Sequence, residues 1–450
     1  MTRSTQRWAL ASTLTAWLLQ AGSVSALGLI QAYDAALKND PAYRSAVYEN
    51  EAGKLNKTVG LSNLLPSLSA NYAPGKNWSS ISSPDALGQS VTVQRNYNSK
   101  SSSVQLRQAL FNLDGIARYR QGIAQADYSD AQFASRRQDL ILRLVSAYSE
   151  AKYAEDSQAL AIAQRDAYAE QRSANVRMFE KGEGTKTDVL ETQAKYDLAE
   201  AGVIEAKDKL TDARNALAAI VGQEITALDP LRDDFRVKPV QPSSFEEWKA
   251  IALEHNPDII AQRHVVEASL QEVKKNRAGH APRLDLTASY SDNRSDTIYT
   301  IQNTYKTTSV GLQLNIPIYS GGYVSATTSQ AVSNYEKAKA DLDTKTSQIL
   351  VDLRKNFNQS VSSVLRIEAL LKSVSSASLL VDATQKSVKG GLRTNFDVLN
   401  AQQQLFTAKR DLSLARYNYL LGYLRLRQAA GIVDANELQT IAGYFVANSQ

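Results

Sequence analysis

The side chains most often used in catalysis and metal binding are scarce in this sequence. It contains three histidines, His255, His264 and His280, and no cysteine. The histidines form no pair with carboxylates at the helical spacing of a zinc site. Without cysteine the chain has no thiol nucleophile, and it contains neither a Gly-x-Ser-x-Gly turn nor a phosphate-binding loop. We therefore expect no enzyme, no metal site and no cofactor.

Charged residues are spread along the chain rather than gathered into a patch. The formal net charge is +5, and Lys and Arg alternate with Asp and Glu in the stretches that look helical. This alternation is typical of solvated helix faces, whereas nucleic-acid binding requires a basic stripe. We expect no nucleic-acid partner.

The first 26 residues have the composition of an export signal. Arg3 and Arg7 precede a mostly apolar run, and Val24 and Ala26 occupy the positions that a signal peptidase reads. The alternative, a membrane anchor, requires about 20 apolar residues, and the run is shorter. We predict a signal peptide at residues 1–26, with Leu27 as the first mature residue. No other long apolar stretch follows, and the mean hydropathy is −0.34, which argues against an inner-membrane protein.

The rest of the chain contains an internal duplication. Ala36–Pro41 reappears as Ala252–Pro257, displaced by 216 positions, and further on Gly182 and Gly222 match Gly391 and Gly431 at a displacement of 209. Such matches at both ends of a segment indicate two structural repeats. We predict a first repeat at 27–222, a linker at 223–243, a second repeat at 244–431 and a short C-terminal tail at 432–450.

Both repeats have the same order of predicted elements. A helix (28–62 and 244–278) ends before a proline, Pro66 or Pro282, and a pair of strands with period-two alternation follows. Ser-, Asn- and Gly-rich loops are expected at 75–96 and 291–304. A long proline-free helix (115–180 and 323–388) then leads through a glycine turn to another helix (186–221 and 395–430). The fold class is therefore mixed α and β, and mostly α.

Two strands per repeat give four per chain, and the strands have the alternation of an outer-membrane barrel. Four strands cannot close a barrel, because the smallest has eight, and an open edge is not tolerated in lipid. A ring of three chains would supply twelve strands. The long helices would each reach roughly 100 Å, a length that suits the wall of a water-filled cylinder.

Three segments resemble the TolC-like outer membrane factor family, whose element order matches essentially the whole mature chain. Leu314–Gly322, which includes Pro317, Gly321 and Gly322, is similar to the family's strand-to-helix junction. Arg393–Leu399 resembles its periplasmic turn, and Ala415–Leu420 resembles its final helix. The short tail and the absent lipidation cysteine look most like the type I secretion members, including those that secrete proteases.

The resemblance implies a homotrimer with a twelve-stranded outer-membrane β-barrel continued by a periplasmic α-helical barrel. It also implies docking to a periplasmic adaptor protein and an inner-membrane ABC exporter. The expected function is an exit duct that passes an unfolded protein cargo to the cell exterior. The channel of a multidrug efflux pump is one alternative, and a periplasmic coiled-coil scaffold or adaptor is another.

The resemblance also implies a closable periplasmic end. Arg393 matches the family's gate arginine, with Thr187 and Asp188 as its expected partners. Asp397 matches a constriction aspartate, and three copies around an axis would favour cations and raise the pKa of this carboxyl.

Two positions depart from the family pattern, since Asn400 replaces a second constriction aspartate and Val388 stands where a gate tyrosine would be. We therefore expect a gate held by fewer hydrogen bonds and a weaker cation site. For Asp188 and Asp397 a plainer role is open, because a carboxylate in the first turn of a helix also stabilises the free amides there.

Overall fold

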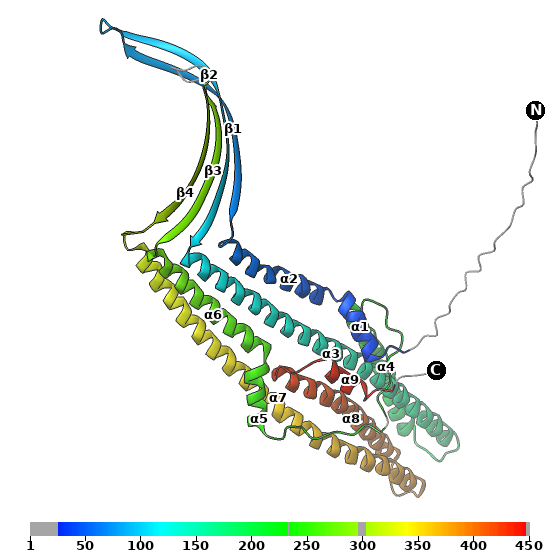
Figure 1. The fold of residues 1–450 in the computed structure, drawn as a ribbon. Coiled ribbons are helices and arrows are strands. Elements are labelled where there is room, and N and C mark those ends of the chain that lie inside the picture. Colours follow the sequence, from blue (N-terminus) through cyan, green and yellow to red (C-terminus); the bar gives the residue numbers. More distant parts are fainter. Residues whose placement is uncertain (1–25, 233, 296–302, 447–450) are drawn as a thin grey trace, which may run out of the picture.

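The computed structural model describes residues 26–232, 234–295 and 303–446. Of the predicted signal peptide, only Ala26 lies among the described residues. The molecule is elongated, with a four-stranded sheet extending from one end of a long array of helices (Figure 1). This agrees with the mostly helical mixed fold expected from the sequence.

The sheet consists of β1 (Ser67–Pro84), β2 (Ser90–Phe111), β3 (Arg283–Ser295) and β4 (Asn303–Asn315). Its order is β1-β2-β3-β4 and every neighbouring pair is antiparallel. The prediction of a loop at 75–96 is wrong, because only residues 85–89 of this segment lie outside the strands. Polar cross-strand pairs stabilise this part, including Asn77 to Ser99 at 3.0 Å and Ser82 to Thr92 at 2.7 Å. Of the loop expected at 291–304, residues 291–295, 303 and 304 are strand, and 296–302 lie outside the described residues.

The two repeats meet in the sheet between β2 and β3. Arg107 of β2 donates to Asp285 Oδ2 of β3 at 2.6 Å, and Arg283 reaches the same carboxylate at 3.1 Å. The Asp285 side chain is only 3% exposed, so the two guanidinium groups compensate a buried charge. Elsewhere the strands expose large apolar side chains, among them Val310, Leu312 and Leu314 of β4.

The first helix of each repeat is broken in two, which corrects the single helices predicted at 28–62 and 244–278. The first repeat has α1 (Leu29–Asn39) and α2 (Pro41–Ser62), and the second has α5 (Phe245–His255) and α6 (Pro257–Arg277), followed by the 3-10 turn η1 (Ala278–His280). Asp40 and Asn256 precede the prolines in extended conformation and cap the second helix of each pair. A residue before proline is disfavoured in helical conformation, which explains the breaks.

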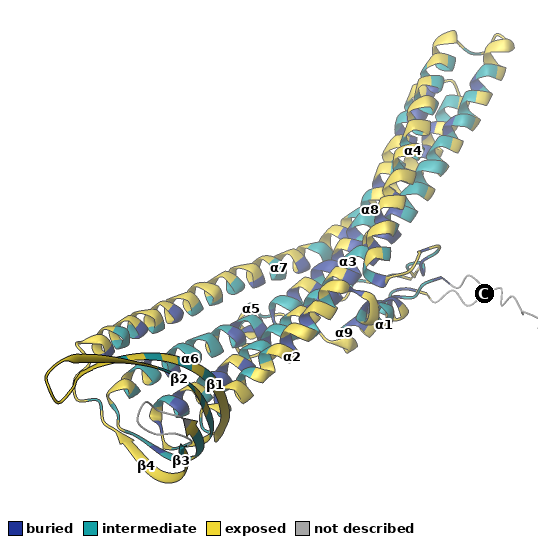
Figure 2. Ribbon diagram, turned by 90° about the horizontal axis from the view of Figure 1, so that it is seen from above, coloured by how far each residue is buried: buried dark blue, intermediate teal, exposed yellow. Residues whose placement is uncertain are grey.

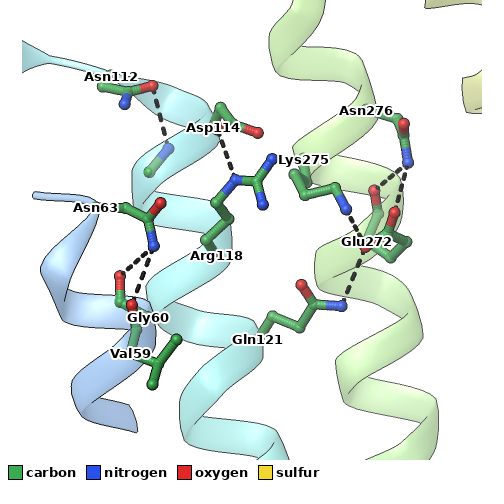
Figure 3. Close-up of polar contacts among 11 residues, drawn as sticks. Val59, Gly60, Asn63, Asn112, Asp114, Arg118, Gln121, Glu272, Lys275 and Asn276 are labelled. Atoms are coloured by element: carbon green, nitrogen blue, oxygen red, sulfur yellow. Dashed lines mark hydrogen bonds and ion pairs between the residues drawn. The ribbon is translucent and has the colours of Figure 1, made fainter. Parts of the chain in front are cut away.

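The long helices are confirmed nearly to the residue. They are α3 (Leu113–Glu180) and α7 (Tyr323–Lys389), which turn back into α4 (Lys186–Val221) and α8 (Asn395–Ala429). None of the described helices is long and apolar enough to cross a membrane. At the sheet end, Asn112 caps α3 by accepting from Gly115 N at 3.1 Å, and Gln121 of α3 donates to Glu272 of α6 at 3.1 Å (Figure 3).

The largest hydrophobic core lies midway along the helices, where the two repeats and the first and last described segments meet. Its buried residues include Leu29 of α1, Tyr148 of α3, Leu217 of α4 and Leu424 of α8. The predicted C-terminal tail contributes as well, since it contains α9 (Ala435–Ala442), whose Ile441 is fully buried. Buried residues concentrate in this middle part, while the sheet and the far helical ends are mostly exposed (Figure 2).

Candidate functional site

The predicted gate residues lie at the end of the molecule farthest from the sheet. Here α3 turns into α4 and α7 turns into α8, and the two turns lie side by side in both overall views (Figures 1 and 2). Each turn uses a glycine with positive φ, Gly182 at 77° and Gly391 at 71°. These are the positions that the duplication aligned, and only glycine adopts this conformation without strain. The two turns are called the helical tip below.

Asp188 and Asp397 both act as capping residues at the tip. Asp188 Oδ2 accepts from the backbone N of Thr185 at 3.2 Å and from its hydroxyl at 2.5 Å. Asp397 Oδ2 makes the equivalent bonds with Thr394, both at 3.0 Å. The structure therefore places each carboxylate where it stabilises the start of its own helix.

The charge of Asp397 is favoured within the single chain. The hydrogen bonds from the backbone N and the hydroxyl of Thr394 lower the pKa of the Asp397 carboxyl, and the neighbouring Arg393 adds to this effect. The expected rise in this pKa depends on two further copies around an axis, so it stays a prediction for the assembled protein.

Arg393 and Thr187 are both exposed at the tip. Among the described residues, Arg393 has no hydrogen bond or ion pair with Thr187 or Asp188. The two turns lie side by side, but the link predicted between them is not formed in the single chain. It stays a prediction for the assembly, in which neighbouring chains bring further tips to the same end.

A buried polar cluster just above the tip was missed by the sequence analysis. Asn395, the first residue of α8, accepts from Gln171 of α3 at 2.5 Å and donates to Thr192 of α4 at 3.4 Å. Thr192 also accepts from Asn175 at 2.6 Å. Asn175, Thr192 and Asn395 are each at most 9% exposed. These four residues, the tip cluster, join the hairpin of the first repeat to the hairpin of the second.

The strand-to-helix junction predicted from the sequence follows β4. Gly321 and Gly322 both have positive φ, 59° and 78°, and Gly322 caps α7. A Cβ at either glycine would meet nothing within 4 Å, so the backbone conformation and not crowding requires glycine here. Pro317 lies between the end of β4 and this turn, and the neighbouring Ile318 and Tyr319 are 95% and 87% exposed.

Metal-ligand chemistry has no support within the described ranges. No group of three or more His, Asp or Glu side chains in them is arranged to hold a metal ion. A pocket of about 740 Å³ lies between α3, α4 and α8, and its lining combines charged side chains such as Glu150 and Arg410 with the aromatic Tyr153 and Phe406.

The elongated shape and the order of strands and helices are those of one family of proteins. The model of the outer membrane efflux protein family matches residues 32–223 and 248–432, and the chain belongs to this family. It is therefore an outer-membrane protein, and the TolC-like resemblance inferred from the sequence is confirmed.

Two individual proteins that are similar to this chain are named for the secretion of proteases. The chain is 42% identical to the alkaline protease secretion protein AprF of Pseudomonas aeruginosa, over 94% of this chain and 88% of that protein. It is 38% identical to the proteases secretion protein PrtF of Dickeya chrysanthemi, over 95% and 93% of the two chains. Among solved structures, the outer membrane protein VceC of Vibrio cholerae has a TM-score of 0.76 at 19% identity, with 90% of this chain and 96% of that chain covered. That likeness supports the fold.

Proposed function

We propose that this protein is the outer-membrane exit duct of a type I secretion system that exports proteases. It would extend from the outer membrane into the periplasm and pass an unfolded protein cargo received from an inner-membrane ABC exporter and a periplasmic adaptor. The observation that carries this proposal is the similarity to two protease secretion proteins over nearly the whole chain.

The geometry of the chain supports assembly into a closed ring. In the sheet, β1 and β4 are the edge strands. Among the helices, α3 packs against α2, α4, α6 and α8, while α7 packs against α6 and α8. One edge of the helical layer is therefore α2 with α4, and the other is α7. Since α2 leads into β1 and β4 leads into α7, the sheet and the helices have their free edges on the same two sides.

Both helical edges expose apolar side chains at regular spacing. On α7, Val351, Leu365 and Leu379 recur every fourteen residues and are each at least 64% exposed. On α4, Leu190 and Ile204 have the same spacing and are 58% and 61% exposed. Two heptads separate such positions, which is the repeat of helices that pack along one another. We infer that α7 of one protomer packs against α2 and α4 of the next, so that three copies close a homotrimer with twelve strands.

The predicted roles at the tip fit this assembly. We propose that Arg393, Thr187 and Asp188 hold the periplasmic end closed through contacts between chains, and that three Asp397 carboxylates form a cation ring in the lumen. Because Asp188 and Asp397 also cap their own helices, each would combine a structural and a gating role. The division into a signal peptide (1–26), two repeats (27–222 and 244–431), a linker and a tail belongs to the same proposal.

Two other functions compete with the secretion duct. A multidrug efflux channel shares the fold, and the solved structures do not distinguish the two functions. A periplasmic scaffold or adaptor would not need the sheet, whose edge strands and exposed apolar side chains favour insertion in lipid as part of a ring.

Extraction and sizing would test the assembly. After alkaline carbonate treatment of cell envelopes, the protein should remain in the membrane pellet and migrate in mild detergent as three chains. Leu365→Glu should reduce the trimer because it places charge in the inferred contact, whereas the control Gln359→Glu adds the same charge at an exposed residue of α7 that lies outside the fourteen-residue repeat. A carbonate-soluble monomer would contradict the duct.

A further inference from the structure

The first residues after the predicted signal peptide are fixed to the linker between the repeats. Leu27 N donates to Ala227 O at 2.9 Å, and Leu27 pairs with Leu228 in a parallel bridge. The buried Tyr148 of α3 binds both segments, since its hydroxyl donates to Leu27 O at 2.8 Å and accepts from Asp229 N at 3.1 Å.

A buried carboxylate lies beside the same backbone. Asp229 is 7% exposed, and a Cβ built on Gly28 would lie 3.0 Å from Asp229 Oδ2. Burial makes the largest contribution to the raised pKa of the Tyr148 hydroxyl, and the negative charge of Asp229 raises it further. Because the same Tyr148 hydroxyl binds both Leu27 O and Asp229 N, residue 229 lies close to the Leu27 backbone. A buried carboxylate is stabilised by a positive group at short range.

The linker also binds the other end of the chain. Arg232 N donates to Tyr444 O at 2.9 Å, Val446 N donates to Pro230 O at 2.9 Å, and Leu231 pairs with Phe445. Phe445 in turn packs edge-on against Tyr148, with ring centroids 5.2 Å apart. The linker at 227–232 therefore joins the segment that begins at Leu27 to residues 444–446 within the largest core.

We propose that removal of the signal peptide creates a structural charge in this core, in which the α-ammonium group of Leu27 binds between the Ala227 carbonyl and the Asp229 carboxylate. The inference rests on cleavage after Ala26. A signal peptidase adds water across the Ala26–Leu27 peptide bond, so that the new carboxylate leaves with Ala26 and the new amine stays on Leu27 and takes up a proton. Because Ala26 is only 8% exposed, the bond must be cut before this segment packs against the linker.

The site has a direct chemical consequence. An exposed α-amine has a pKa near 8, so a fraction of it is neutral at pH 7 and reacts with acylating reagents. An ammonium held by a carboxylate and a carbonyl is protected, because each unit by which its pKa rises reduces the neutral fraction about tenfold. In the mature protein the Leu27 amine should therefore be poorly reactive, although it lies at a chain end.

The experiment measures acylation of the purified, detergent-solubilised trimer at pH 7, with the N-terminal peptide quantified by mass spectrometry. We expect an N-terminus at Leu27, and an amine that reacts about tenfold or more slowly than after unfolding in denaturant. Asp229→Asn should speed its reaction. The matched control is Asp234→Asn, which removes an exposed carboxylate of the same linker that pairs with Arg232 and should leave the rate unchanged.

Several results would overturn the proposal. A mature N-terminus other than Leu27 would do so, as would equal acylation rates in the folded and unfolded wild-type protein. Equal rates in the wild type and a folded Asp229→Asn trimer would exclude the carboxylate. If Asp229→Asn fails to assemble, the pH dependence of acylation in the folded wild type decides: a held ammonium predicts a rate that still climbs above pH 8, and a rate that levels off near pH 8 would overturn the proposal. Single-channel conductance measured on the same preparation reports on the duct separately, so failure of the ammonium site leaves that function testable.

Discussion

Gly431 lies directly against Asn256, so closely that a Cβ on the glycine would come within 2.4 Å of the Asn256 Cα. Asn256 Nδ2 also donates to Ala429 O at 2.9 Å, which joins the break between α5 and α6 to the end of α8. The first repeat has a related contact at the same place, because Gly222 abuts the side chain of Asn39, which corresponds to His255 in the duplication, and Asn39 donates to Val221 O at 2.8 Å. The duplication thus preserves a contact in space as well as a sequence pattern.

Gly431→Ala should strongly destabilise the protein. Gly431 has φ 81°, and the added methyl would also meet the backbone of the α5–α6 break. We expect a loss of about 3 kcal/mol in the free energy of unfolding, from left-handed strain plus overpacking. Gly391→Ala is the control, since φ is 71° there but a Cβ meets nothing within 4 Å; about 1 kcal/mol is expected. Similar thermal midpoints for the two variants would contradict the close packing.

Thr192→Val should loosen the tip cluster. The change preserves shape but removes the oxygen that accepts from Asn175 and Asn395, so buried amides lose a partner at a cost of about 1–3 kcal/mol. Hydrogen exchange in the first turns of α8 should become faster. The control is Thr211→Val on the same helix, whose exposed hydroxyl only donates to Lys207 O. If exchange in α8 is the same in both variants, the cluster does not hold the two hairpins together.

Arg393→Ser combined with Asp188→Asn should raise the single-channel conductance of the trimer in planar bilayers. The reason is that the proposed gate would lose the charged contacts between chains. Asparagine is chosen because Asp188 also caps α4, and an amide oxygen preserves part of that function. Lys389→Ser removes an exposed charge close to the same turn and should leave conductance unchanged. Unaltered conductance in an assembled double mutant would refute the gate assignment.

Asp397→Asn should weaken the block of the channel by multivalent cations. Hydrogen bonds from Thr394 lower the pKa of the Asp397 carboxyl within the single chain, which favours its charged form. The variant removes the charges and keeps an acceptor for the helix cap. The channel current of the wild type and of the variant is titrated with a trivalent cation. If both are blocked at the same concentration, Asp397 only caps its helix.

The sequence was sufficient for features that depend on local pattern. The absence of proline and the glycines at 182 and 391 defined α3, α4, α7 and α8 almost to the residue. The helix breaks were missed although Pro41 and Pro257 mark them, because the apolar pattern continues across each break. The length of β1 and β2 was also missed. Their outer parts are rich in Ser and Asn, and such residues are stabilised by pairing with the neighbouring strand.

The tip cluster could not be predicted because it depends on how two hairpins lie in space. Gln171 and Asn175 are one turn apart on α3, which is an ordinary spacing for solvated polar residues. Asn175 is buried and Gln171 half-buried only because Thr192 and Asn395, from two other helices, lie against them. By contrast, the capping function of Asp188 and Asp397 followed from their position alone.

The most direct test of the proposed function is protein secretion by the cell that makes this protein. Deleting its gene should leave protease activity inside the cells and abolish it in the medium, and expression of the intact chain should restore export. The Leu365→Glu variant should fail to restore it, because the ring cannot close, while the Gln359→Glu control should succeed. Normal protease export in the deletion strain, together with increased sensitivity to drugs, would contradict the secretion duct and identify an efflux channel instead.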